Sequence, residues 1–165
     1  MSISDEIVRA NAVYAAGADL ANLPGAPRRR FAVLTCMDTR LDPNQFLGLS
    51  LGDAHVLRNA GAIVTEDVLR SLAVSHMKLG TQEVLVIGHS GCGLATFANE
   101  ELWDRLRREL GADPEGFDFL PFPDVEQNVR DGVRRIRDWP LLPDSYTASG
   151  FVFDTVAGTL SPVEA

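Results

Sequence analysis

The chain has 165 residues, of which 45% are hydrophobic and 23% are charged, and a formal net charge of −8 at neutral pH. This composition is ordinary for a globular protein and predicts a single domain that spans residues 1–165. The negative charge argues against a nucleic-acid partner, which needs clustered lysine and arginine, and no apolar stretch approaches the ~20 residues of a membrane-spanning helix.

The first half of the chain has the pattern of one helix followed by two strands. Residues 2–20 predict an amphipathic helix with Ser2 or Ser4 as the N-cap and acidic residues in the first turn. No basic segment precedes an apolar run there, so this segment is not a signal peptide, and we expect a cytoplasmic protein. FAVLTC, at residues 31–36, is a continuous apolar run of strand length, and residues 54–62 predict a second strand that runs into a glycine-containing loop.

The second half of the chain continues the alternation of helices and strands. Its expected elements are, in order, a helix over residues 65–80, a strand over 83–89, helices over 101–110 and 124–138, and a strand or hairpin over 150–163. Helices that alternate with almost entirely apolar strands predict an α/β fold with a mostly parallel central β-sheet flanked by helices.

Two short motifs carry the residues with chemical potential. LTCMDTRLDP places Cys36, Asp38 and Arg40 at alternate positions, so at a strand end their side chains point the same way. GHSGCG places His89 three residues before Cys92. Each motif lies at the carboxyl end of an expected parallel strand, where α/β sheets bind their ligands, so we expect the two motifs to meet in space.

The two cysteines of the chain leave three interpretations open. They could be small buried hydrophobic residues, reactive thiols or metal ligands, because a structural disulfide would be unusual in a reducing compartment. Two thiolates and one imidazole suit tetrahedral Zn2+, and three protein ligands with one open position are typical of a catalytic zinc site. Cys36, His89 and Cys92 supply this set, which favours the metal interpretation.

The motifs CMDTR, RNAG and HSGCG, in this order, resemble those of the β-class carbonic anhydrases. The resemblance implies that Cys36, His89 and Cys92 bind one Zn2+ per subunit. It also implies that Asp38 and Arg40 form a catalytic dyad beside the metal.

The same resemblance has implications for the fold and the assembly. It implies a β-carbonic anhydrase-like domain whose N-terminal helical arm, residues 1–25, packs on a neighbouring subunit. The expected assembly is a homodimer or a homotetramer.

For the reaction, the resemblance implies zinc-dependent reversible hydration of CO2 to bicarbonate by zinc-bound hydroxide. Asp38 could orient the bound water by accepting its hydrogen bond, or it could become the fourth zinc ligand and close the site. Arg40 decides between these states, because a bidentate guanidinium–carboxylate pair holds Asp38 away from the metal.

A few positions depart from the plant-type members of the family. His55 and Leu72 stand about where those members have a pocket Phe and a pocket Tyr, and Pro27 is near the position of their substrate-binding Gln. His55 is a candidate proton shuttle, because the ordinary pKa of histidine suits that task.

Three other functions compete with CO2 hydration. Carbonyl sulfide and carbon disulfide hydrolases resemble the same family and use the same zinc ligands, so hydrolysis of these substrates is the first alternative. The second alternative is a non-catalytic, zinc-stabilised binding domain that Asp38 keeps closed. Thiol oxidoreductase chemistry comes third, because Cys36 and Cys92 are not in a C-x-x-C arrangement.

Overall fold

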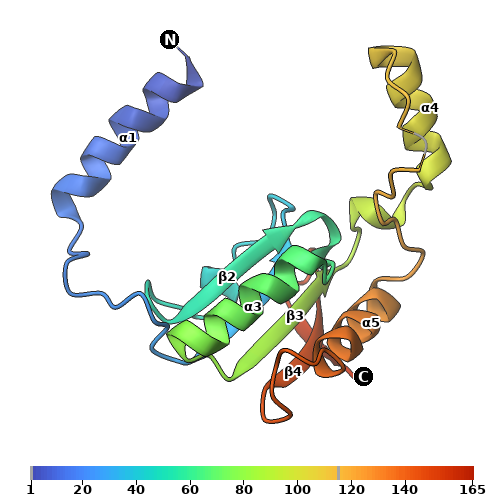
Figure 1. The fold of residues 1–165 in the computed structure, drawn as a ribbon. Helices are drawn as coiled ribbons and strands as arrows, with labels where there is room; N and C mark the ends of the chain where they lie inside the picture. Colours follow the sequence, from blue (N-terminus) through green and yellow to red (C-terminus); the bar gives the residue numbers. More distant parts are fainter. Residues whose placement is uncertain (1, 115) are drawn as a thin grey trace.

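The chain folds around one five-stranded sheet. The computed structural model describes residues 2–114 and 116–165. Its strands are β1 (Phe31–Cys36), β2 (Ala54–Asn59), β3 (Glu83–His89), β4 (Thr147–Phe153) and β5 (Leu160–Val163). They lie in the order β2-β1-β3-β4-β5, with the first four parallel and β5 antiparallel to β4 (Figure 1). The prediction of a mostly parallel sheet is confirmed.

The most apolar strands occupy the middle of the sheet. All six residues of β1 are buried, whereas β2, at the edge, alternates between partly buried and exposed residues. A strand covered on both faces needs no polar alternation, which explains the continuous apolar run of β1. In the parallel register Cys36 pairs with Asn59 of β2, so the carboxyl ends of the strands lie at one edge of the sheet.

Helices cover the two faces of the sheet unequally. The helices are α1 (Ile3–Gly17), α2 (Pro43–Phe46), α3 (Glu66–Leu79), α4 (Asn99–Leu110) and α5 (Val125–Arg137), with short 3-10 turns η1 (Ala60–Ala62) and η2 (Gly93–Ala95). One hydrophobic cluster joins Leu34 of β1 to α3 and α5. A second cluster, on the opposite face, joins Val33 to Phe46 and the loop around α2.

The ends of α3 and α5 follow the capping signals in the sequence. The Thr65 side chain accepts a hydrogen bond from the Val68 N–H at the start of α3, and Gly80 ends that helix in the left-handed region at φ +74°. Asp124 accepts from the Gln127 N–H at the start of α5. The two predicted helices are confirmed to within one residue at each end.

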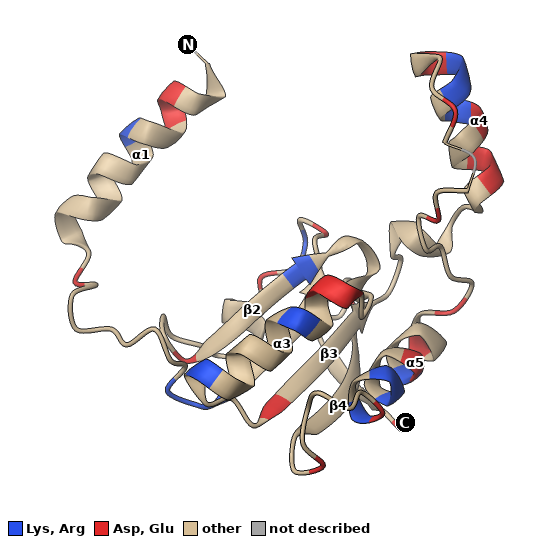
Figure 2. Ribbon diagram, viewed as in Figure 1, with Lys and Arg blue, Asp and Glu red and all other residues tan. Residues whose placement is uncertain are grey.

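Helices α1 and α4 extend away from the sheet in different directions (Figure 1). No residue of either helix is buried. The two differ in composition: α4 carries many charges of both signs, whereas α1 carries few (Figure 2). Ser2 and Asp5 form a capping box that starts α1, which ends at Gly17 and is therefore shorter than the predicted range of 2–20.

The C-terminal segment contains both of the predicted alternatives, a parallel strand and a hairpin. Strand β4 begins at Thr147, three residues before the predicted start at Gly150. The polar Thr147 and Ser149 interrupt the apolar pattern of the sequence, but their backbones pair with β3. The turn after β4 then leads into β5. Among the described helices, none combines the length and the apolarity needed to cross a membrane.

Candidate metal centre

The carboxyl ends of β1 and β3 bring three potential metal ligands together. Cys36 is the last residue of β1, His89 is the last residue of β3, and Cys92 follows in the next loop. The two Sγ atoms and a ring nitrogen of His89 all lie within 4.8 Å of one another, and all three side chains are buried. The expected meeting of the two motifs is confirmed.

The ring of His89 is oriented as a ligand. Its Nδ1 lies 3.0 Å from the carbonyl oxygen of Ser90, which can only accept, so Nδ1 carries the proton and Nε2 presents a lone pair. This Nε2 is buried and has no hydrogen-bond partner among the described residues. Buried polar atoms are rarely left unpaired, so this atom fits a site that receives a cation.

The two thiols also fit a cation. Burial, together with the neighbouring Cys36, raises the pKa of the Cys92 thiol. Two thiolates side by side in the protein interior would repel one another, and a divalent cation removes this cost and favours their ionisation. The Cys36 Sγ accepts a hydrogen bond from the Gly61 N–H at 3.3 Å.

Asp38 and Arg40 form a bidentate pair at the edge of the cluster. Arg40 Nε and Nη2 donate to the two carboxylate oxygens at 2.9 and 2.8 Å, and the Arg40 backbone N–H donates at 3.0 Å. These hydrogen bonds from Arg40 hold the pKa of Asp38 well below its usual range. The carboxylate also lies beside the ligands, because Asp38 Oδ2, which accepts from Arg40, is 3.9 Å from His89 Nε2.

Further residues that sequence reasoning missed support this arrangement. Arg58 of β2 donates to the carbonyl oxygens of Cys36 at 3.0 Å and of Asp38 at 2.7 Å, and so fixes the loop after β1. Asn128 of α5 donates to the Gly61 carbonyl at 3.1 Å, and the N–H of the same residue donates to Cys36 Sγ, so Asn128 helps to hold Gly61 in place beside the cluster. Arg58 belongs to the RNAG motif, and this motif is the feature of the sequence that could have identified it.

Comparisons with known proteins agree with this geometry. A family model described as carbonic anhydrase matches residues 31–110. Beta-carbonic anhydrase 1 of Mycobacterium tuberculosis is 39% identical over 163 residues, 99% of each chain. The chain belongs to the β-carbonic anhydrase family.

Solved structures and more distant relatives refine this assignment. A crystal structure of carbonic anhydrase from Streptococcus mutans matches with a TM-score of 0.95 and 44% identity over 99% of each chain. A carbon disulfide hydrolase of Saccharolobus solfataricus is 34% identical, over 82% of this chain and 78% of the relative. The family thus includes relatives named for two different substrates.

Two positions singled out as departures from plant-type β-carbonic anhydrases lie away from the metal cluster. His55 is near the start of β2, four residues before Asn59, so it stands ~13 Å along the strand from the edge that holds Cys36. Its ring binds the Ser75 hydroxyl at 2.7 Å and the Gly25 carbonyl at 3.3 Å. The structure therefore does not bring His55 to the metal cluster within the same chain, and the shuttle role stays a prediction. Leu72 is fully buried in the core.

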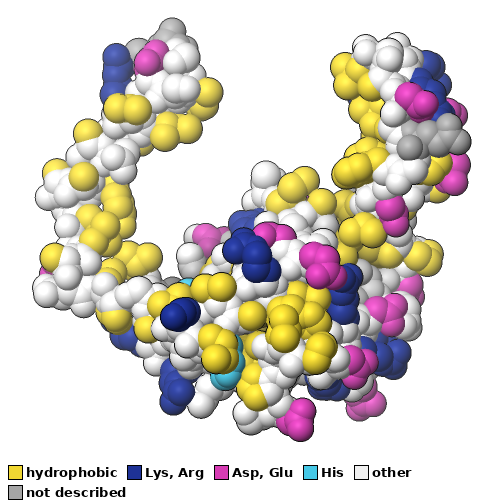
Figure 3. Space-filling view, in the orientation of Figure 1, with side chains coloured by type: hydrophobic (Ala, Val, Ile, Leu, Met, Phe, Trp, Pro, Cys, Tyr) yellow, Lys and Arg dark blue, Asp and Glu magenta, His cyan; other side chains and the backbone are white. Residues whose placement is uncertain are grey.

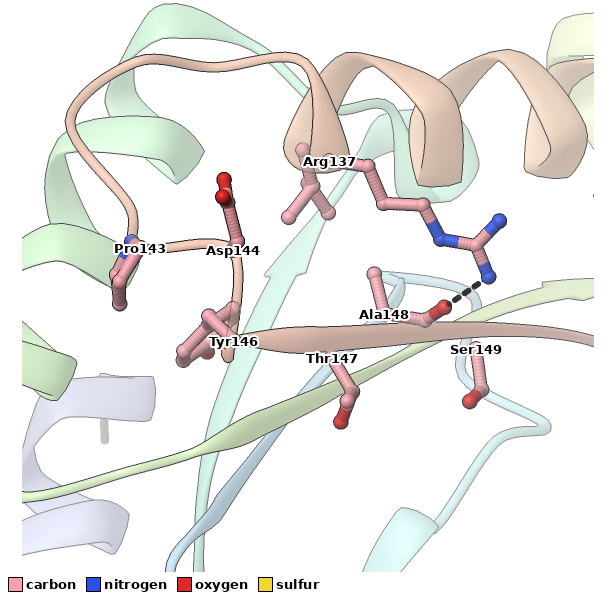
Figure 4. A pocket seen from close by; sticks show the side chains of 8 residues that line it. Arg137, Pro143, Asp144, Tyr146, Thr147, Ala148 and Ser149 are labelled. Atoms are coloured by element: carbon pink, nitrogen blue, oxygen red, sulfur yellow. Dashed lines mark hydrogen bonds between the residues drawn. The ribbon is translucent and has the colours of Figure 1, made fainter.

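A cavity among the described residues lies at the opposite edge of the sheet from the metal cluster. It has a volume of about 460 Å3 and is formed by the end of α5 and the start of β4. Arg137 projects across it and donates to the Ala148 carbonyl at 2.8 Å (Figure 4). Its described lining includes no cysteine or histidine, so it offers none of the chemistry of the β-carbonic anhydrase site.

Proposed function

We propose that this protein catalyses the reversible hydration of CO2 to bicarbonate, with one Zn2+ per subunit held by Cys36, His89 and Cys92. The observation that carries the proposal is the buried Cys-His-Cys cluster with an ionised carboxylate beside it. When bound there, zinc supplies the Lewis acidity that makes a water molecule a competent nucleophile near neutral pH. Full-length similarity to a named β-carbonic anhydrase supports the same reaction.

The protein's own residues orient the reacting water. Asp38 is ionised and lies beside His89 Nε2, so it can accept a hydrogen bond from the attacking water and turn its lone pair toward the carbon. The water oxygen then bonds to carbon, one C=O π pair moves to its oxygen, and the released proton passes to buffer. Arg40 keeps the Asp38 carboxylate out of the ligand cluster while this happens.

Asp38 is also a candidate for the fourth ligand position in a closed state. The 3.9 Å between its Oδ2 and His89 Nε2 is short enough that rotation of the carboxylate would bring it among the ligands. In this proposal Arg40 selects the open state by keeping both carboxylate oxygens occupied.

Hydrolysis of carbonyl sulfide or carbon disulfide is the second candidate function. It is favoured by the carbon disulfide hydrolase relatives, which match about four-fifths of this chain. Hydration of CO2 is preferred because the match to a named β-carbonic anhydrase is both more identical and complete in length.

The test compares both substrates on one zinc-loaded preparation of the full chain. We expect fast CO2 hydration in stopped-flow measurements and little H2S release from carbonyl sulfide. Dominant H2S release would instead support the hydrolase, and the absence of both activities at alkaline pH would support a zinc-stabilised binding domain.

A matched pair of histidine variants tests the ligand set. The His89→Ala variant should lose most of its zinc, as measured by elemental analysis. It should lose its CO2 hydration activity together with the metal. His55→Ala, which removes a histidine outside the cluster, should retain one zinc per chain. Equal zinc contents in the two variants would contradict the proposed ligands.

We further propose a homodimer or homotetramer in which α1 of one subunit packs on another. Ile3, Ile7 and Tyr14 of α1 are exposed by 68%, 60% and 54%, which is unfavourable in water. A groove between β2 and α3, lined by apolar residues that include Val56, Leu57 and Val74, is a suitable surface for them.

A cytoplasmic location is consistent with the unpaired state of Cys36 and Cys92.

A further inference from the structure

A hydrogen-bonded clasp lies behind the metal cluster and joins the residues that follow two neighbouring strands. Ser90 follows β3, and Thr155 lies two residues beyond β4. The Thr155 N–H donates to Ser90 Oγ at 2.9 Å, and the two hydroxyl oxygens lie 3.1 Å apart. The Thr155 hydroxyl also donates to the Ser90 carbonyl at 3.3 Å.

One assignment of hydrogens satisfies every contact of the clasp. Thr155 gives its hydroxyl proton to the Ser90 carbonyl, Ser90 gives its own to Thr155 Oγ1, and the second Oγ1 lone pair remains to accept from Arg40. The Thr155 hydroxyl oxygen therefore keeps one lone pair that accepts a hydrogen bond from the Arg40 guanidinium.

The clasp touches both parts of the proposed active site. The Ser90 carbonyl also accepts the His89 Nδ1 proton at 3.0 Å. Arg40 Nη1 donates to Thr155 Oγ1 at 3.4 Å, and Arg40 Nη2 donates to the Gly91 carbonyl at 3.2 Å as well as to Asp38. One edge of the guanidinium thus holds Asp38, while the rest is held by the loop after β3 and by Thr155.

We propose that Thr155 is a positioning residue that keeps Arg40 in the orientation that withholds Asp38 from the metal. The inference rests on the proposed function, in which Asp38 either orients water or closes the site. The Arg40 side chain is half exposed, so without Thr155 its guanidinium is freer to turn toward solvent and release Asp38. Thr155 lies outside residues 31–110, which the family model matches, and was not singled out in the sequence.

The test measures how accessible the metal is in the full-length protein loaded with Co2+. Thiocyanate is titrated and followed by visible absorbance, because an anion and the Asp38 carboxylate compete for the same ligand position. The apparent Kd rises in proportion as the open fraction falls. We expect Thr155→Val to raise the ratio of closed to open sites roughly twofold to tenfold, the factor that the loss of one hydrogen bond supplies, and the apparent Kd by the same factor wherever closed sites predominate.

Matched variants separate the lost hydroxyl from other effects. Thr155→Ser keeps the hydroxyl and should bind thiocyanate as the unmodified protein does, whereas Thr155→Ala should behave as Thr155→Val does. Thermal unfolding of each variant checks that it folds, and the Thr155→Ala result decides the matter if Thr155→Val does not fold.

A double-mutant cycle with Asp38 identifies the route of the effect. In an Asp38→Ala background the site cannot be closed by that carboxylate, so adding Thr155→Val should leave the thiocyanate affinity unchanged. An unchanged Kd in Thr155→Val alone, or a rise that persists without Asp38, would overturn the inference. The titration reads metal access directly, so it decides the role of Thr155 whether or not the protein hydrates CO2.

Discussion

Tyr146 precedes β4 and packs into the hydrophobic cluster beneath α3 and α5, where only 4% of the residue is exposed. Its hydroxyl donates to the Glu83 carbonyl at 3.4 Å, and its ring meets His76 edge to face. Burial raises the pKa of Tyr146 to about 12, because the phenolate would lose its hydration. This single side chain therefore links the stability of the fold to alkaline pH.

The raised pKa of Tyr146 predicts a loss of stability at alkaline pH. The folded state holds the phenol proton more tightly than the unfolded state, so stability is complete below the ordinary pKa of 10.0 and falls as pH rises toward about 12. In a Tyr14→Phe variant, whose remaining phenol is Tyr146, the ultraviolet absorbance of phenolate should appear with a midpoint about 12. A midpoint near 10 in a protein whose circular dichroism is still native would contradict the prediction.

The residues of the metal cluster were predictable because their chemistry is local in sequence. Cys36, His89 and Cys92 stand at the ends of recognisable apolar strands, and parallel strands bring such ends together. Thr155 and Asn128 were not predictable, because their contacts join distant segments. Arg40 and Thr155 are 115 positions apart, and Gly61 and Asn128 are 67 apart. Such pairs depend on the register of β4 and the seating of α5, which no spacing rule specifies.

At the scale of elements, α5 packs closely on the sheet because the strands carry glycine, which has no side chain, at the points of contact. An added Cβ at Gly150 of β4 would stand 2.6 Å from Val129 Cγ1, and one at Gly88 of β3 would stand 2.8 Å from Val125 Cγ1. Valine is stiff at χ1 in a helix, so these methyl groups cannot easily turn away. The close approach of α5 also places Asn128 against the carbonyl of Gly61, the residue whose N–H donates to Cys36 Sγ.

Gly150→Ala is therefore expected to push α5 away from the sheet. Overpacking of this kind costs ~1–3 kcal/mol of the free energy of unfolding, measured by urea denaturation of the zinc-loaded protein. Gly25→Ala is the matched control, because an added Cβ there meets no atom within 4 Å, and it should cost nothing. Equal stability of the two variants would show that α5 does not rest on Gly150 as described.

The strands differed in how well the sequence predicted them, and burial explains the difference. β1 and β3 have the predicted bounds, because each contains a continuous apolar run that is largely buried in the middle of the sheet. The start of β4 was missed because Thr147 and Ser149 interrupt the apolar pattern while their backbones pair with β3. The segment after α4 carried no periodic signal, and its path depends on contacts such as Trp103 Nε1 with the Phe117 carbonyl.

At the scale of the whole molecule, the most unusual feature is the amount of apolar surface that α1 leaves uncovered. Figure 3 shows hydrophobic side chains along this helix, which stands clear of the sheet. Ile3, Ile7, Ala10 and Tyr14 recur at the spacing of one helix face, and none of them is buried. A helix of fifteen residues with no buried residue is marginal in water, so we expect its stability to depend on a surface outside this chain's own core, as in the proposed assembly.

A charge placed on the apolar face of α1 should therefore break the proposed assembly. Ile7→Glu should convert the oligomer to a monomer in light scattering coupled to size-exclusion chromatography, because burial of an unpaired carboxylate opposes the contact. Ala16→Glu places the same charge on the opposite face of the helix, by the period of 3.6 residues per turn, and should leave the oligomer intact. If the Ile7→Glu variant keeps the mass of the unmodified oligomer, α1 is not the contact. If the unmodified protein is itself a monomer, the proposed assembly is wrong, and the apolar face of α1 must then be stable in water without a partner.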